Sequence, residues 1–269
     1  MSLFRVCFMH KPSFRQVFAC VAAIALVGSI AFIIAKSRAN SHSSKGVASH
    51  AEPHLILWAW ERPTDLRFIN PNEVGVAFLA KTINLESDGV SVRPRLQSLN
   101  IPDATSVIAV ARIEIDRHHQ PALSIDQRER TAREIAEISL LPNVSEVQID
   151  FDATKSEREF YREVIEDVRH RLPASTRLSI TALASWCMDD DWISDLPIDE
   201  AVPMLFRMAG DGKQIVNRLN AGEDFQAPLC RQSYGVSLDE QRPNTTQARK
   251  LYVFNPDAWT EKSVMESSK

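Results

Sequence analysis

Two carboxylates two residues apart are the first feature of this chain that could support chemistry. In VQIDFDA, residues 147–153, Asp150 and Asp152 alternate with apolar residues, and Gln148 precedes them in the same phase. Alternate side chains of a β-strand point to opposite faces, so the pattern predicts that these three share one face. Close carboxylates raise one another's pKa, which prepares one as a proton donor while the other stays ionised.

Further polar and aromatic residues end other predicted strands. Arg112 and Glu114 share one side of VARIEID, and Glu114 is the third candidate catalytic carboxylate beside Asp150 and Asp152. Tryptophan rings suit the apolar C–H patches of sugars. The candidate substrate-binding residues are Trp58, Trp60, Glu61, Arg112, Gln148, Trp186 and Arg207.

Two other interpretations use the same residues. Arg112 and Arg207 would neutralise Glu114 and Asp150 in an internal ion-pair network, because unpaired buried charges cost several kcal/mol each. A divalent metal would instead take hard oxygen ligands from Glu114, Asp150 and Asp152. His118 and His119 follow the third predicted strand and look like loop residues, so no histidine is expected beside the carboxylates. We therefore expect no zinc site, and we expect no cofactor.

Strand-like and helix-like segments alternate along the chain. Two predicted helices, 124–141 and 155–172, open with the capping boxes SIDQ and TKSE. Partial helices are expected at 88–99, 211–221 and 239–249. The eight predicted strands are 54–60, 74–82, 106–115, 144–153, 177–186, 201–207, 232–238 and 250–255.

This alternation favours parallel pairing with right-handed crossovers, and eight units predict a (β/α)8 TIM-like barrel. A doubly wound open sheet is the alternative, although no strand is followed by a Gly-rich phosphate turn. In a barrel the carboxyl ends of the strands meet at one end. We therefore expect the candidate residues to gather there.

The N-terminus differs in kind from the rest. Residues 17–35 are nineteen residues without a charge, close to the ~20 that span a bilayer core as a helix. We expect a transmembrane signal-anchor at 17–35, with a cytoplasmic N-terminus at 1–16. Beyond the span we expect a flexible linker at 36–53, the barrel at 54–256 and a polar C-terminal tail at 257–269.

These expectations place the domain in the periplasm, held at a bacterial inner membrane. Cleavage near residues 37–39 with secretion is one alternative, and a cytoplasmic domain is another. The net charge of -4 and the lack of a basic stripe give no reason to expect nucleic acid as a partner. Cys187 and Cys230 either pair outside the cytoplasm or remain buried thiols.

Several motifs, in order, resemble one family. The chain is similar to the bacterial domain of unknown function numbered 3142 over residues 54–212, which implies a fold similar to TIM-barrel glycoside hydrolases. The motifs are LWAWERPTDLRF, GVAFLA, VARIEID, VQIDFDATKSEREFY, LSITALASWC and DEAVPMLFRM.

The resemblance extends to chitinase-like barrels, whose fourth strand ends in Asp-x-Asp-x-Glu. One register places Thr154 at the position of the Glu and leaves no acid. The other places Gln148, Asp150 and Asp152 on the three positions, with a shorter acid. Either departure weakens a chitinase assignment.

The favoured hypothesis is a membrane-anchored glycoside-hydrolase-like protein that acts on a cell-envelope or extracellular polysaccharide. Asp152 would be the general acid, with Asp150 or Glu114 as its partner carboxylate. A non-catalytic envelope protein that binds glycan or another partner is the second hypothesis. A metal-dependent hydrolase is the third.

Overall fold

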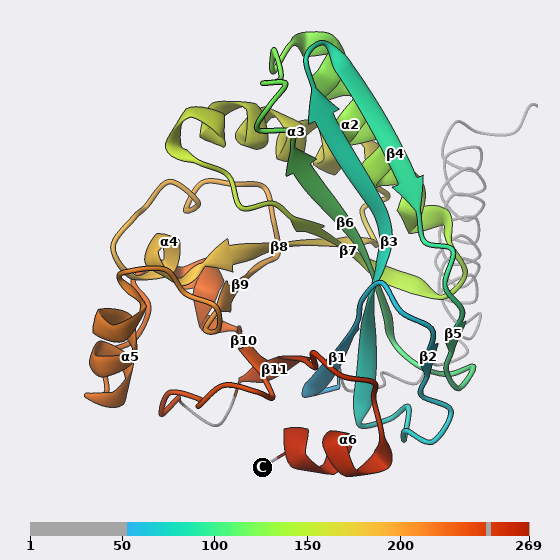
Figure 1. Ribbon diagram of the computed structural model, residues 1–269, viewed down its shortest axis with the longest axis vertical. Coiled ribbons are helices and arrows are strands. Elements are labelled where there is room, and N and C mark those ends of the chain that lie inside the picture. The colour runs from blue at the N-terminus through green and yellow to red at the C-terminus, as the bar shows by residue number, and fades with distance from the viewer. Residues whose placement is uncertain (1–52, 246–248, 269) are drawn as a thin grey trace, which may run out of the picture. The chain divides into compact units, whose positions relative to one another are not determined.

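Eight parallel strands close into a barrel in the computed structural model, which describes residues 53–245 and 249–268 (Figure 1). The ring follows chain order and closes because β1 pairs with both β3 and β11. This closure confirms the TIM-like barrel and excludes the open doubly wound sheet. The strands are β1 (Leu55–Ala59), β3 (Val74–Glu86), β6 (Val107–Ile115), β7 (Val144–Asp150), β8 (Arg177–Leu183), β9 (Glu200–Met204), β10 (Ser233–Ser237) and β11 (Lys250–Phe254).

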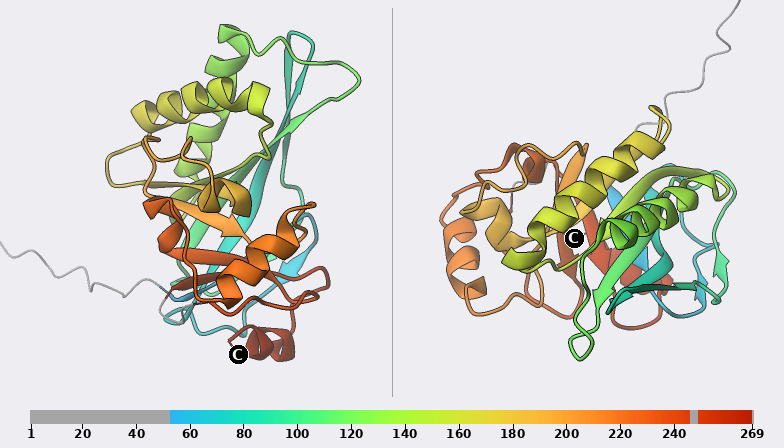
Figure 2. Two further views of the ribbon diagram at one scale, coloured as in Figure 1. Left: turned by 90° about the vertical axis from the view of Figure 1, so that its left-hand side faces the viewer. Right: turned by 90° about the horizontal axis from the view of Figure 1, so that it is seen from above.

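Two long helices lie side by side on the outside of the barrel (Figure 2). α2 (Ile125–Glu137) begins at the capping box of Ser124 and Gln127, as predicted. α3 (Arg158–Arg171) follows the short helix η2 (Lys155–Glu157). The remaining helices are η1 (Ile138–Leu140), α4 (Ala184–Met188), α5 (Gly212–Asn220), η3 (Pro228–Arg231) and α6 (Glu261–Ser267).

The expectation of a partial helix at 88–99 is wrong. β4 (Gly89–Pro94) pairs antiparallel with β3 in a tight hairpin, with Ser87 at φ 43° in the turn. A two-residue hairpin turn requires positive φ, and the Asp-Gly pair at its end is a hairpin signal that the helical prediction overlooked. The short strands β2 (Thr64–Asp65) and β5 (Leu99–Asn100) pair with each other in a separate two-stranded sheet.

The other partial helices had mixed outcomes. The expected helix at 211–221 is confirmed as α5. No helix forms over 239–245, and 246–248 lie outside the described residues.

The barrel interior and its outer layer have different compositions. On β7 the apolar Val147 and Ile149 belong to the core beneath the helices, while Gln148 and Asp150 point inward. A small apolar cluster fills the centre of the barrel and includes Trp58. A Cβ at Gly235 would lie 2.9 Å from Met204 Sδ and 3.1 Å from Trp58 Cη2, so a side chain at this position would crowd both neighbours.

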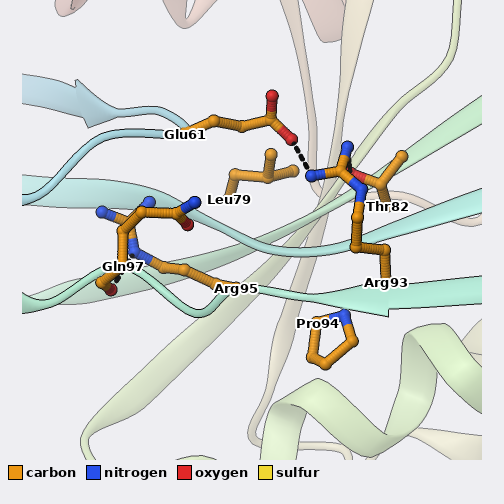
Figure 3. Close-up of a pocket in the computed structure, with 7 residues that line it drawn as sticks. All are labelled: Glu61, Leu79, Thr82, Arg93, Pro94, Arg95 and Gln97. Atoms are coloured by element: carbon orange, nitrogen blue, oxygen red, sulfur yellow. Dashed lines mark hydrogen bonds and ion pairs between the residues drawn. The ribbon is translucent and has the colours of Figure 1, made fainter.

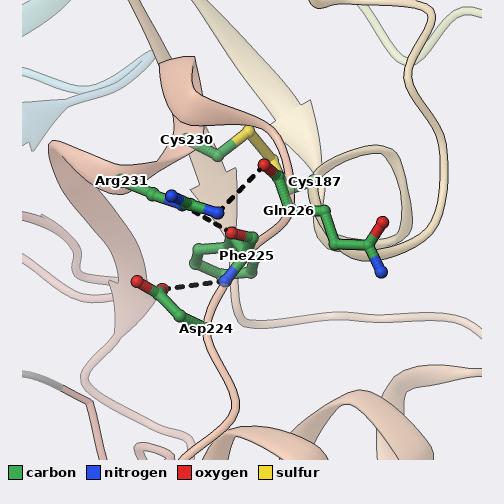
Figure 4. The surroundings of a disulfide bond; sticks show 6 residues. All are labelled: Cys187, Asp224, Phe225, Gln226, Cys230 and Arg231. Atoms are coloured by element: carbon green, nitrogen blue, oxygen red, sulfur yellow. Dashed lines mark hydrogen bonds between the residues drawn. A yellow bond between two sulfur atoms is a disulfide. The ribbon is translucent and has the colours of Figure 1, made fainter.

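One disulfide joins two segments that follow different strands (Figure 4). Cys187 in α4 is bonded to Cys230 in η3, with 5.8 Å between the Cα atoms and both residues fully buried. The backbone nitrogen of Gln226 donates to the carbonyl oxygen of Cys187 at 2.9 Å. The structure thus selects pairing over two free thiols.

Within residues 53–245 and 249–268, no helix is long and apolar enough to cross a membrane. The expected span at 17–35 lies outside the described residues.

Candidate functional site

The carboxyl ends of β6 and β7 bring three predicted site residues into direct contact. Arg112 Nη1 lies 2.7 Å from Asp150 Oδ2, and Arg112 Nε lies 2.9 Å from Glu114 Oε1. The pairing of Arg112 with Asp150 across the two strands explains this proximity. We call Glu114, Asp150, Asp152 and Arg112 the carboxylate cluster.

Asp150 accepts a hydrogen bond at each carboxylate oxygen. Arg112 occupies Oδ2, and the hydroxyl of Thr181 on β8 donates to Oδ1 at 2.7 Å. Asp150 is buried, so these donors replace the water that a charged carboxylate would otherwise bind. Neighbouring strands on both sides of β7 thus hold the Asp150 carboxyl group in place.

Asp152 differs from Asp150 in its position on the chain, in its exposure and in its hydrogen bonds. β7 ends at Asp150 and the chain turns at once, because Ala153 N donates to Phe151 O at 2.9 Å. The prediction that Asp152 continues the strand is therefore wrong, and its exposed carboxyl group has no hydrogen-bond partner among the described residues. Partial loss of hydration raises its pKa, Asp150 raises it further, and Arg112 opposes both.

Tyr161 lies close to Asp150 and Asp152 and was not among the predicted site residues. Its ring packs edge-on against Phe151, with 5.1 Å between the ring centroids. The hydroxyl is fully buried and has no hydrogen-bond partner among the described residues. Burial raises its pKa well above the usual value, followed by the charges of Asp150 and Asp152. In the sequence, Tyr161 is indicated only by its place in the predicted helix 155–172, next to the face expected to pack on the core.

Gln148 supports the site from below and does not reach solvent. Its Oε1 accepts from Trp58 Nε1 at 3.2 Å, and its Nε2 lies 3.3 Å from Ser179 Oγ. Ser179 in turn donates its hydroxyl hydrogen to Glu146. That donation fixes Ser179 as an acceptor for Gln148, which fixes the amide orientation toward Trp58.

Trp58 and Trp60 lie on the same side of the chain, as predicted, at different depths. Trp58 is buried inside the barrel. Trp60 is half-buried at the end of the barrel, with Arg112 Cζ 5.8 Å from its ring centroid. Of the two, only Trp60 offers a surface to a ligand.

The expected position of Trp186 at the rim is wrong. β8 stops at Leu183 and α4 begins at Ala184, so Trp186 turns inward and is 3% exposed. Its ring packs edge-on against Trp192, with 4.9 Å between centroids. Arg158 lies over both rings.

Arg207 is exposed beyond β9, apart from the carboxylate cluster. Its backbone has φ 50°, and Glu240 accepts its N–H at 3.0 Å. The guanidinium lies 5.0 Å from the ring centroid of Phe254, which stacks on Phe206. Neither phenylalanine was among the predicted site residues.

Glu61 lies beside the β3–β4 hairpin. Its carboxylate contacts Arg93 Nη1 at 2.5 Å. With Leu79, Thr82, Pro94, Arg95 and Gln97, this pair lines a small hollow at the surface (Figure 3).

The three predicted carboxylates do not form a group of converging metal ligands. Among the described residues, only Glu86, Asp116 and His119 bring three potential ligand atoms within 4.8 Å of one another. His119 and its neighbour lie in the loop after β6, as expected from the sequence. In the carboxylate cluster the guanidinium of Arg112 fills the position between the acids that a cation would need.

The fold is a TIM-like barrel, and solved structures with this fold are similar to it. A putative chitinase A from Streptomyces coelicolor superposes with TM-score 0.52 at 8% identity, over 80% of this chain and 94% of that chain. The spore cortex-lytic enzyme SleL of Bacillus cereus matches with TM-score 0.46 at 16% identity, over 70% of this chain.

This chain spans 54% of the SleL chain. No family model matches the sequence, and no curated protein sequence matches it significantly. The resemblance to the domain of unknown function numbered 3142 therefore stays a prediction.

Proposed function

We propose that the chain is a glycoside hydrolase of an envelope or extracellular polysaccharide, with its reaction centre at the carboxylate cluster. The observation that carries the proposal is the contrast between two acids at the end of the fourth barrel strand. Asp150 accepts a hydrogen bond at each carboxylate oxygen, whereas Asp152 has no hydrogen-bond partner among the described residues and has a raised pKa. Pairs of carboxyl groups in contrasting environments divide the acid and base roles in glycosidases.

Each residue takes the role that its surroundings allow. Asp152 donates its proton to the glycosidic oxygen as the C–O bond breaks, and Asp150 stabilises the positive charge on the sugar ring. Glu114 accepts a proton from the water that adds to the anomeric carbon, since Arg112 engages only one of its oxygens. Trp60 presents its ring to the sugar.

The geometry also supports one of the two registers against the chitinase motif. Thr154 donates its backbone N–H to Glu157 at 2.7 Å at the start of η2, so its side chain belongs to a helix start. The register with Gln148, Asp150 and Asp152 places a carboxyl group at the acid position. We adopt that register.

A panel of polysaccharides and the full chain test the proposal. Release of reducing ends should fall at least a hundredfold in Asp152→Asn and in Asp150→Asn, as general acid–base groups contribute roughly 10²–10⁴-fold. Asp103→Asn, an exposed aspartate before β6, is the matched control. Turnover that persists in both site variants would contradict the assignment.

A non-catalytic glycan-binding protein is the second candidate, favoured by one observation. Arg112 engages both Asp150 and Glu114, which is also how a static polar network is held together. Under this hypothesis both asparagine variants still bind glycan in a pull-down, and no polysaccharide is cleaved.

We further propose that the barrel domain lies outside the cytoplasm, anchored through residues 17–35. The buried Cys187–Cys230 disulfide supports this placement, because such bonds form in oxidising compartments. Protease digestion of intact spheroplasts should degrade the barrel domain. Recovery of the domain in the medium would favour cleavage and secretion.

A further inference from the structure

One end of the barrel carries large apolar side chains that face solvent. Leu140 and Leu141 directly precede β7 and are 80% and 40% exposed. Phe68, which is 38% exposed, lies in the turn that leads into β3. Because β3, β6 and β7 run parallel, the segments before β3 and β7 lie at the same end of the ring. We call Phe68, Leu140 and Leu141 the apolar end face.

The backbone before β7 fixes the two leucines at the surface. Ile138, the first residue of η1, is buried in the core, and Leu141 N donates to its carbonyl oxygen at 3.2 Å. Val144, the first residue of β7, donates its N–H to Leu141 O at 3.4 Å. The leucines are therefore held outward by an ordered turn, and apolar side chains presented in this way are typical of a contact surface.

The described part of the chain begins at the same end of the barrel. Pro53 lies just before β1, and β1 runs parallel to β3. The uncharged segment 17–35 is the proposed anchor, and it is separated from β1 by the predicted linker at 36–53. A flexible linker of that length has a root-mean-square span of about 25 Å. The anchor would therefore keep this end of the barrel close to the bilayer.

We propose that the apolar end face rests on the lipid bilayer that holds the anchor, an inference that rests on the proposed anchoring. Leucine and phenylalanine side chains lose contact with water when they enter the boundary between headgroups and acyl chains. The tether raises the effective concentration of the barrel at the membrane, so a small apolar contact is enough to orient it.

This contact gives the reaction centre a direction. The carboxylate cluster lies at the carboxyl ends of β6 and β7, and the apolar end face lies where the parallel strands begin. A barrel that rests on its apolar end face therefore opens its site away from the membrane, toward the proposed polysaccharide.

A fluorescent label on single introduced cysteines tests the contact in the full chain. The chain is reconstituted into vesicles of phosphatidylcholine and phosphatidylglycerol. Leu140→Cys places the label on the apolar end face, and Leu183→Cys places it at the carboxyl end of β8, where Leu183 is 37% exposed. Lipids with a nitroxide on the acyl chain should quench the label at position 140 and leave the label at position 183 bright. Iodide in the solution should do the opposite.

The native cysteines do not interfere with this labelling. Cys7→Ser and Cys20→Ser remove the two thiols of the N-terminal segment. Cys187 and Cys230 do not react, because their sulfur atoms are bonded to each other and both residues are fully buried.

A second comparison tests whether the leucines make the contact. With the label at Phe68→Cys, the added pair Leu140→Ser and Leu141→Ser should remove most of the quenching by the nitroxide lipid. Ile125→Ser, at a residue that is 64% exposed at the start of α2, should leave that quenching unchanged. All of these side chains are exposed, and an unchanged melting temperature verifies that each variant folds.

The outcomes separate the contact from the anchoring. A vesicle-bound chain in which the lipid quenches neither position overturns the contact and leaves the anchoring standing. Equal quenching at positions 140 and 183, or quenching at 183 alone, also overturns the contact. Protection of position 140 from iodide without quenching by lipid would assign the apolar end face to a second copy of the chain. A chain that alkaline carbonate removes from the vesicles overturns the anchoring and the contact together.

Discussion

At the scale of single residues, the two aspartates of one short segment acquire opposite properties from their neighbours. Asp150 receives Arg112 and Thr181, while Asp152 stands past the end of the strand without a partner among the described residues. The difference comes from a turn of the chain between them. A catalytic assignment therefore depends on the side chains that surround each acid more than on their spacing.

Removing the charge of Asp150 should lower the pKa of Asp152. The charge of Asp150 is the second cause of the raised pKa, after loss of hydration, and Arg112 acts in the opposite direction. Asp150→Asn removes a raising influence and frees Arg112, so both effects have the same sign. A carbon-detected NMR titration of the Asp152 carboxyl group measures the shift, with Asp103→Asn as control. A rise in pKa would show that Asp150 does not act on Asp152 electrostatically.

Arg112 should matter for stability as well as for charge. Arg112→Met leaves the buried Asp150 with one of its two donors, and losing hydrogen bonds to a buried charged group costs about 1–3 kcal/mol. Urea denaturation measures the change. Arg67→Met removes an exposed pair with Asp65 and should cost less than Arg112→Met, because solvent screens exposed charges. Equal losses in the two variants would mean that the cluster contributes no more than a surface pair.

Alternation along the strands predicted the positions of some candidate residues and misplaced others, while their functional roles stay a prediction. Alternation correctly predicted that Gln148 and Asp150 share a face and that Glu114 lies near them. It failed where a strand stopped early, at Asp152 and at Trp186, because periodicity cannot locate a turn that backbone hydrogen bonds decide. Tyr161 escaped notice because a tyrosine on a helix carries no sign of the hydroxyl's destination.

At the scale of elements, all eight barrel strands were predictable and the connections were less so. The two long helices had capping boxes and an apolar repeat in the sequence, and both formed as expected. The β3–β4 hairpin replaces an expected helix, and it supplies the wall of the hollow. Connections vary because the closed ring of strands constrains only their ends.

The disulfide is the connection whose removal should cost most. Cys187 and Cys230 are 43 residues apart, so the bond restricts a long loop of the unfolded chain. The double variant Cys187→Ala with Cys230→Ala should lose about 2–5 kcal/mol of unfolding free energy. Comparison with the wild type under reducing conditions separates the bond from the side chains. A variant as stable as the oxidised wild type would show that the bond is dispensable.

At the scale of the whole molecule, charged side chains lie at both ends of the barrel interior, with an apolar region between them. One end of the interior holds the carboxylate cluster, the centre holds the apolar cluster with Trp58, and the other end holds a second polar network. In that network Lys250 Nζ contacts Glu200 at 3.0 Å, and Arg177 lies 3.4 Å from Glu146 and 3.6 Å from Glu200. Two carboxylates are thus enclosed where water cannot stabilise their charge.

This second network should make the stability of the whole barrel depend on pH. Burial is the largest cause of the raised pKa of Glu146, and Glu200 adds to it, while Ser179, Lys250 and Arg177 oppose it. The folded chain therefore retains this proton to higher pH than the unfolded chain, whose carboxyl titrates near 4.5. Folding stability due to Glu146 falls as pH rises from 4.5 through the folded-state pKa.

Glu146→Gln removes this dependence, because the amide stays neutral and still accepts from Ser179. Relative to wild type, the variant should gain unfolding free energy as the pH rises above about 4.5, until the pH has passed the raised folded-state pKa of Glu146. Urea denaturation at a series of pH values measures the difference, and Glu159→Gln on the exposed face of α3 supplies the baseline. If the variant instead loses stability toward neutral pH, Arg177 and Lys250 hold Glu146 ionised. Their effect on the pKa of Glu146 would then outweigh that of burial.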